Sequence, residues 1–95
     1  MSVSSADRLI ASPDVLVRAV GDEMVLLNLA SETYFGLDPV ATRMWQLLIE
    51  CDSIESARDA LLAEYEVASD ALQRDLDAFI GELVAQNLVS VAPRG

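Results

Sequence analysis

Short runs of apolar residues, separated by polar or glycine-containing segments, make up the first part of the chain. These runs lie at residues 15–20 (VLVRAV), 24–29 (MVLLNL) and 33–37 (TYFGL). Their β-branched, leucine and aromatic side chains favour extended strands. Gly21, followed by Asp22 and Glu23, is typical of a hairpin turn in which one position needs a permissive glycine. The pattern therefore predicts three antiparallel strands that pair in sequence order.

Helical spacing of apolar residues begins after residue 38. Asp38 can cap the free amides at a helix start, and the fixed φ angle of Pro39 suits the first helical turn. Apolar residues then follow at positions i, i+3, i+4 and i+7, namely Ala41, Met44, Trp45 and Leu48. This spacing predicts a helix over residues 39–50 with an apolar stripe that faces the core.

Two further helices are predicted downstream. Asp52 and Glu55 resemble a capping box at the start of a helix over residues 53–65. Ser69 is expected to cap a longer helix over residues 70–87. The inner side of that helix is expected to carry Leu72, Leu76, Phe79, Leu83 and Val84. Residues 88–91 then look like a short closing segment.

The length of 95 residues is that of one small domain. Residues 1–13 have no sustained periodicity and are rich in serine, so we expect a mobile N-terminal segment with order beginning near Asp14. Residues 14–92 are expected to form one α+β domain, with a three-stranded antiparallel sheet followed by three helices. This combination of a hairpin and three helices is similar to a winged helix-turn-helix.

The charge of the chain argues against two classes of partner. All six basic residues are arginine, against sixteen Asp and Glu, which gives a formal net charge of -10. Nucleic acid and anionic membranes would repel such a chain, so we expect neither as a partner, and the acidic helix over residues 70–87 does not suit a DNA groove. The first thirteen residues lack the apolar centre of a signal peptide or membrane span. A cytoplasmic location is expected.

The residue types exclude most familiar catalytic machinery. The chain has no histidine and one cysteine, Cys51, so it has no Ser-His-Asp triad, Cys-His pair, common zinc ligand set or internal disulfide. Asp75 and Asp77 are two residues apart and point to different helix faces. Asp70 and Asp77 have no histidine or apolar pocket to split their pKa values. We interpret these carboxylates as a solvated face and expect no enzymatic activity, no cofactor and no metal.

Two non-enzymatic functions are also considered, an acyl carrier and a plain interaction module. The tripeptide Asp52-Ser53-Ile54 resembles the Asp-Ser-Leu of acyl carrier proteins, whose serine carries a phosphopantetheine arm. The predicted strands upstream and the cysteine before the tripeptide fit that family poorly, so capping a helix is the favoured role for Ser53. An acyl carrier modified at Ser53 and a plain acidic interaction module both stay open.

The strand predicted at residues 33–37 is a candidate binding element. If it forms the edge of the sheet, its unpaired N–H and C=O groups are a template to which a disordered peptide can add as a further strand. A neighbouring helix would then supply side-chain pockets. A solvated or covered edge is the simpler structural alternative.

Residues 25–48 (VLLNLASETYFGLDPVATRMWQLL) resemble the PqqD-like family, the leader-recognition domains of ribosomally made, post-translationally modified peptides. The shared elements are the LLNL strand, Tyr34-Phe35 before Gly36-Leu37, the helix start at Asp38-Pro39, and Trp45 followed by Leu47-Leu48. Aspartate replaces the asparagine often found at that helix start, and residues 30–32 lack the glycine often found in that turn. The resemblance extends over about residues 15–91.

The resemblance implies a winged helix-turn-helix-like domain that binds the leader of a precursor peptide as an extra strand against the third strand. The third helix would close the groove, and the domain would deliver its substrate without transforming it. On this sequence, the residues implied on the strand side are Thr33, Tyr34, Phe35 and Gly36. Those implied on the helix side are Leu72, Asp75, Leu76 and Phe79.

The chain is most similar to the separate recognition protein of lasso peptide pathways. That resemblance implies a leader protease and a cyclase as further partners. The pyrroloquinoline quinone version, which hands its precursor to a radical enzyme, is the alternative within the same family.

Overall fold

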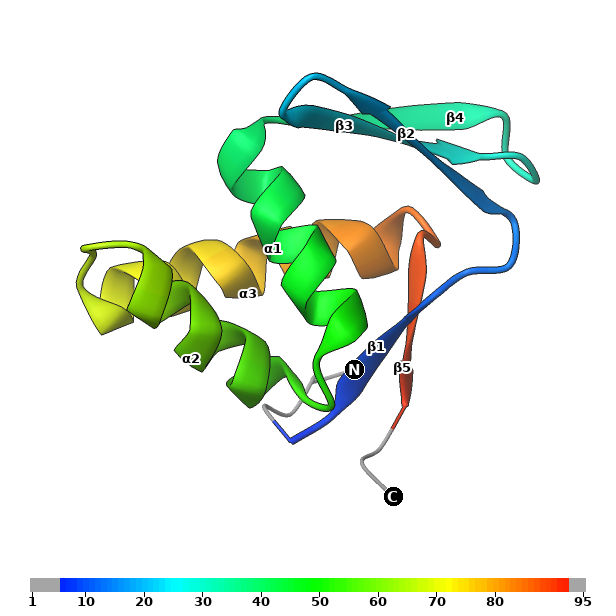
Figure 1. Cartoon of the computed structure of the whole chain (residues 1–95). Helices are drawn as coiled ribbons and strands as arrows, with labels where there is room; N and C mark the ends of the chain where they lie inside the picture. Colours follow the sequence, from blue (N-terminus) through cyan, green and yellow to red (C-terminus); the bar gives the residue numbers. More distant parts are fainter. Residues whose placement is uncertain (1–5, 93–95) are drawn as a thin grey trace.

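The computed structural model describes residues 6–92 as an α+β arrangement of strands and helices (Figure 1). Strands β2 (Val15–Val20), β3 (Glu23–Asn28) and β4 (Thr33–Leu37) form a three-stranded antiparallel sheet in the order β2-β3-β4. The helices that follow are α1 (Pro39–Glu50), α2 (Ile54–Glu64) and α3 (Ser69–Ala85). This architecture confirms the predicted fold class and the predicted order of elements.

A second small sheet was not predicted. Strand β1 (Arg8–Ala11) pairs antiparallel with strand β5 (Val89–Ala92), and Leu9 of β1 is fully buried. The expectation that order begins near Asp14 is therefore wrong, because residues 8–11 already form a paired strand. The part of the expected N-terminal segment at residues 1–5 lies outside the described residues. A four-residue strand has too few positions to show a period, and its partner lies at the other end of the chain, so no local pattern indicated this pairing.

The helix starts follow capping chemistry, with two corrections. Asp38 caps α1 as predicted, because its Oδ1 accepts a hydrogen bond from the amide of Ala41 at 2.8 Å. Helix α2 is capped by Ser53 and not by a box of Asp52 and Glu55, since Ser53 Oγ accepts from the Ser56 amide at 3.1 Å. Helix α3 begins one residue earlier than expected. Its N-cap is Ala68, which makes no side-chain hydrogen bond, and Ser69 is the first helical residue.

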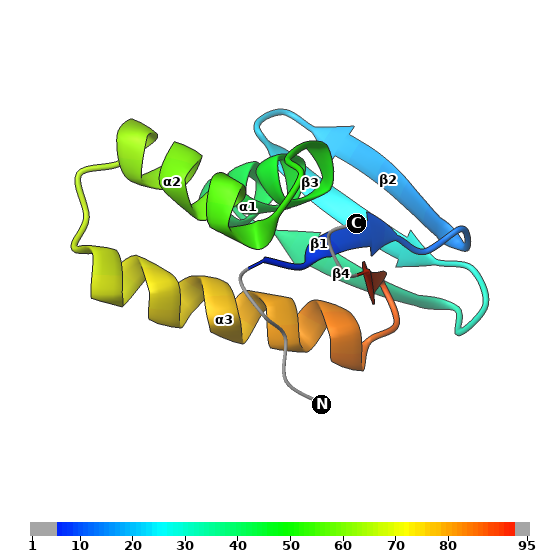
Figure 2. The same ribbon diagram turned by 90° about the horizontal axis from the view of Figure 1, so that it is seen from below.

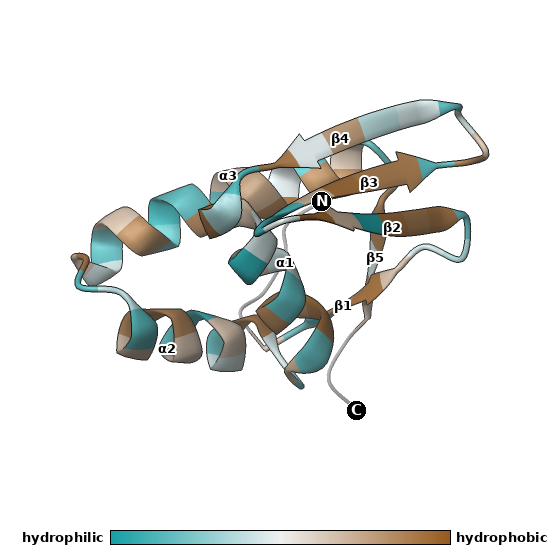
Figure 3. Cartoon of the chain, turned by 45° about the horizontal axis from the view of Figure 1, so that its top comes forward, coloured by the Kyte–Doolittle hydropathy of each residue, from teal (hydrophilic) through white to brown (hydrophobic). Residues whose placement is uncertain are grey.

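The core is built mostly of leucine, with contributions from every helix and from both sheets. The fully buried leucines are Leu9, Leu26, Leu48, Leu61, Leu76, Leu83 and Leu88. The predicted stripe of α1 is confirmed for Met44, Trp45 and Leu48, which are all buried, while Ala41 is half-buried. Figure 3 shows β3 as hydrophobic along most of its length and β4 as mixed. Strand β4 thus buries fewer of its residues in the core than β3 does.

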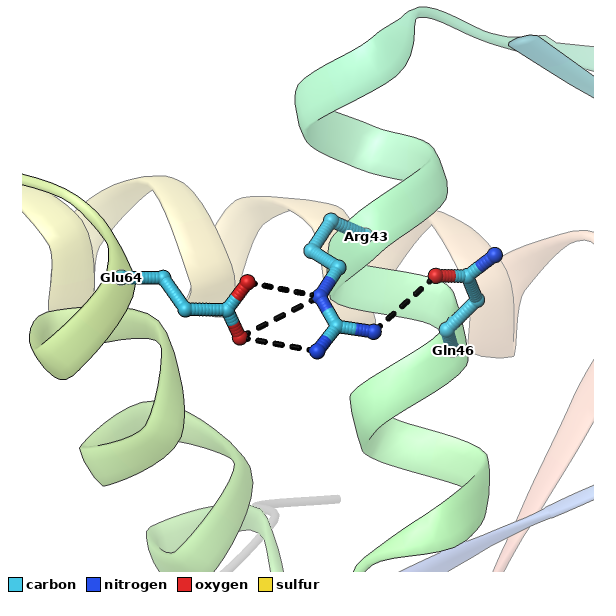
Figure 4. A network of polar contacts seen from close by, with 3 residues as sticks. All are labelled: Arg43, Gln46 and Glu64. Atoms are coloured by element: carbon cyan, nitrogen blue, oxygen red, sulfur yellow. Dashed lines mark hydrogen bonds and ion pairs between the residues drawn. The ribbon is translucent and has the colours of Figure 1, made fainter. Parts of the chain in front are cut away.

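An ion pair on the surface joins α1 to α2 (Figure 4). The guanidinium of Arg43 binds the carboxylate of Glu64 through Nε at 2.8 Å and Nη2 at 2.9 Å, and its Nη1 donates to Gln46 at 3.1 Å. The two-pronged hydrogen bonding to Arg43 lowers the pKa of Glu64, and the same contact raises the pKa of Arg43. Because both side chains are more than one-third exposed, we expect the pair to contribute little to stability.

The lowered pKa of Glu64 predicts a specific pH dependence. A carboxyl whose pKa is depressed on folding contributes stability above its unfolded pKa and loses that contribution as the pH falls through its folded pKa. We expect the Glu64 carboxyl carbon, followed by NMR, to titrate below the usual glutamate range, and to return to that range in an Arg43→Gln variant. An unchanged midpoint in the variant would contradict the ion pair.

Candidate functional site

Strand β4 forms one edge of its sheet. Strand β3 lies on one side of it, and among residues 6–92 no strand pairs with its other side. Because side chains alternate along a strand, Phe35 and Leu37 face the helices, while Tyr34 and Gly36 face outward. Leu37 is buried and Phe35 half-buried, whereas Tyr34 is 79% exposed. The strand thus combines an anchored inner face with an open outer face.

Alternation along β3 decides which backbone groups of β4 face the open edge. Val20 and Glu23 are register partners on either side of a two-residue turn. Leu29, directly after β3, donates its N–H to the Asp14 carbonyl at 2.9 Å, so Leu29 and every second residue before it, back to Glu23, bond toward β2. The residues between them bond toward β4. The β4 partners of those intervening residues are Thr33, Phe35 and Leu37. Tyr34 and Gly36 therefore direct their N–H and C=O groups away from the sheet.

Helix α3 lies next to this edge through an aromatic contact. Figures 1 and 2 show β4 running alongside the C-terminal half of α3. Phe35 of β4 meets Phe79 of α3 edge to face, with ring centroids 6.5 Å apart and ring planes at 80°. Both rings are half-buried, so the contact joins the core to the surface beside β4.

The structure separates the residues implied on the helix side into two groups. Leu72 and Leu76 are 5% and 0% exposed and pack into the core. Asp75 is exposed and Phe79 half-buried, so of the four only these two reach the surface. The four residues implied on the strand side all lie in β4, and Phe35 touches Phe79. The structure therefore places Phe79 beside the β4 residues, whereas Leu72 and Leu76 point into the core.

Asn28 fixes the end of the β3–β4 hairpin against α3, and sequence reasoning did not assign it a role. It is 4% exposed, and its Nδ2 donates to the carbonyls of Gln86 and Asn87, both at 3.3 Å. Its Oδ1 accepts from the amides of Ala30 and Ser31 at 3.0 and 3.2 Å. All four hydrogen-bonding positions of the amide are thus used. The signal in the sequence was a polar residue inside an apolar run.

Ser53 has the capping role that the sequence favoured. Its side chain is buried, its Oγ accepts from the Ser56 amide, and it also bonds the Ser56 hydroxyl at 3.1 Å. A transferase would have to reach a hydroxyl of a residue that is only 2% exposed. The structure therefore argues against modification at this serine.

The described residues offer limited chemistry beyond backbone bonding and apolar contact. Residues 6–92 contain no group of three or more His, Cys, Asp or Glu side chains placed to hold a metal ion. None of the helices in this part of the chain combines the length and the apolar character needed to cross a membrane. Cys51 is half-buried at the end of α1. The candidate site is therefore the open edge of β4 together with Phe79.

Residues 23–89 match the family model described as coenzyme PQQ synthesis protein D (PqqD), and the chain belongs to this family. The matched region runs from β3 to the start of β5 and includes the whole candidate site. No curated protein sequence matches the chain.

Two solved structures are similar to the chain over most of its length. One is TbiB1 in complex with the TbiA(beta) leader peptide, which is 41% identical, with a TM-score of 0.80 over 85% of this chain and 94% of that one. The other is a lasso peptide synthetase B1 complexed with the leader peptide, which is 30% identical, with a TM-score of 0.73 over 93% of this chain and 99% of that one. The resemblance to the PqqD-like family is confirmed.

Proposed function

We propose that this chain binds the leader region of a ribosomally synthesised precursor peptide by strand addition to the outer edge of β4. The observation that carries the proposal is the open edge itself, where Tyr34 and Gly36 direct backbone groups outward. Backbone bonds at such an edge provide affinity for an extended peptide of almost any sequence. Side chains beside the edge then provide selectivity.

Phe79 supports the proposal because it positions an apolar surface beside that edge. Its ring packs against Phe35 of β4, and Asn28 bonds the end of the hairpin to the residues that follow α3. A peptide that adds to β4 would find this frame already formed, so it would lose little free energy in ordering the protein. A preformed frame suits a protein whose task is binding.

The lasso peptide pathway is the context we propose. Both similar structures contain a leader peptide, and their proteins are similar to this chain over 85% and 93% of its length. In that context the chain would act in the cytoplasm without catalysing a reaction, and would present the precursor to a leader protease and a cyclase. The match to the PqqD model favours a second candidate, a peptide chaperone that hands its precursor to a radical enzyme in pyrroloquinoline quinone biosynthesis.

Fluorescence anisotropy with labelled peptides tests the proposal and separates the two pathways. The chain is titrated against three labelled peptides: the TbiA(beta) leader peptide, a scrambled version of it, and the precursor peptide of a pyrroloquinoline quinone pathway. We expect saturable binding of the leader and none of the scrambled peptide. If the precursor peptide of the pyrroloquinoline quinone pathway binds more tightly than the TbiA(beta) leader peptide, the second candidate is favoured.

Amide hydrogen exchange then locates the peptide. The amides of Tyr34 and Gly36 face outward, so they should exchange readily in the free chain and become protected when the leader binds. Protection of β2 amides, with β4 unchanged, would contradict strand addition at the β4 edge.

A further inference from the structure

We infer that Asp75 and Glu82 make the β4 edge selective for leaders that carry basic residues on both sides of the residue lying over Phe79. The inference rests on the proposed function. It says which side chains a bound leader peptide should carry, which backbone pairing alone does not determine. It makes Asp75 and Glu82 specificity-determining residues of that site.

The direction of each side chain around α3 is the first step. An α-helix turns about 100° per residue, so Asp75 and Glu82 project about 40° and 60° from Phe79, both on the same side. Leu76 and Leu83 project on the opposite side of Phe79 and are fully buried. Phe79 thus lies at a boundary, with the core on one side and two exposed carboxylates on the other. Because Phe79 contacts edge strand β4, the carboxylate side lies beyond that edge, where an added strand would run.

Both carboxylates are available to a ligand. Within residues 6–92, neither the Asp75 nor the Glu82 side chain takes part in a hydrogen bond or ion pair. Asp77, on the far side of α3, instead accepts a hydrogen bond from Gln73 at 2.8 Å. Asp75 and Glu82 therefore present negative charge that the fold itself does not use.

Neither β4 nor α3 places a basic side chain beside Phe79. Strand β4 has no charged residue, and the residues that flank it are Glu32 and Asp38. The only basic residue of α3 is Arg74, which projects about 140° from Phe79. A cationic side chain from a bound peptide is the complement that this surface lacks.

The spacing of the two acids matches an extended peptide. Each helical residue rises about 1.5 Å, so Asp75 lies about 6 Å before Phe79 along the axis and Glu82 about 4.5 Å after it. Side chains on one face of a strand are about 6.6 Å apart. Strand β4 runs alongside α3 (Figure 2). In a peptide strand added to β4, one residue would therefore lie over Phe79, and the residues two positions before and two positions after it would lie near Asp75 and Glu82. The pattern is Lys or Arg, any residue, an apolar residue, any residue, Lys or Arg.

A charge scan of the peptide against matched protein variants tests this inference. The probe is the TbiA(beta) leader peptide with a fluorescent label, in a set in which each position in turn is replaced by lysine or by glutamate. The protein variants are the double substitution Asp75→Asn with Glu82→Gln, and a control, Asp59→Asn with Asp77→Asn. The control removes the same charge from exposed positions on α2 and on the far side of α3.

Position-specific preference is the expected result. Lysine at two positions four residues apart should tighten binding about threefold each at low ionic strength, and glutamate there should weaken it by a similar factor. Both effects should disappear in the Asp75/Glu82 variant and persist in the Asp59/Asp77 control. High salt should reduce them, because the charges are exposed.

Two other results would overturn the inference, and they are distinguishable from each other. If wild type binds the leader but lysine helps equally at every position, or the control variant loses the same preference, only the overall charge of -10 matters. If wild type binds no peptide of the set, the proposed function itself fails.

Discussion

Replacing Gly36 by proline should lower the affinity of the chain for a leader peptide by at least about tenfold while leaving the sheet intact. Gly36 directs its N–H toward the open edge, so a proline there removes a donor that an added strand needs, and its ring obstructs the edge. A lost hydrogen bond costs about 1 kcal/mol, and exclusion of the neighbouring backbone contacts adds to it. Tenfold corresponds to about 1.4 kcal/mol. Anisotropy titration measures the change.

The matched control is Gly36→Ala, which keeps the N–H. No atom lies within 4 Å of a Cβ added at this position, so the alanine variant should bind as wild type does. Because the Gly36 N–H does not pair with β3, the proline variant should still unfold cooperatively, as circular dichroism would show. A folded proline variant with wild-type affinity would mean that the peptide binds elsewhere.

Replacing Leu76 by alanine should lower the free energy of unfolding by about 2–5 kcal/mol, measured by urea denaturation. Leu76 is fully buried within the core, so the substitution leaves a cavity that its well-packed neighbours fill only in part. This loss is a large fraction of the about 5–15 kcal/mol that stabilises a typical domain.

The same variant distinguishes a core residue from a binding residue. The affinity of the folded fraction for a leader peptide should change little, because Leu76 presents no surface to it. Val67→Ala is a control, since Val67 is 48% exposed and its truncation should cost less than about 0.5 kcal/mol. Lost binding with unchanged stability would instead place Leu76 at the binding surface, as the resemblance implied.

The sequence by itself determined the elements whose information is local. The three strands of the β2–β3–β4 sheet, the three helices and the Asp38 cap all followed from residue types and spacings within a few positions of each other. The edge character of β4 also followed, because strands connected in sequence order leave the last one unpaired on one side. The corrected caps of α2 and α3 show the precision of such reasoning, since Asp and Ser cap about equally well and a helix boundary can shift by one residue.

The tertiary structure alone decided the features that join distant parts of the chain. The pairing of β1 with β5 depends on two short strands from opposite ends, neither of which has a recognisable period. On α3, the period identified an apolar side but not its boundary, so only packing showed that Leu72 and Leu76 belong to the core and Phe79 to the edge. A helix face is assigned by what packs against it, and that information lies in the contacting elements and not in the helix's own sequence.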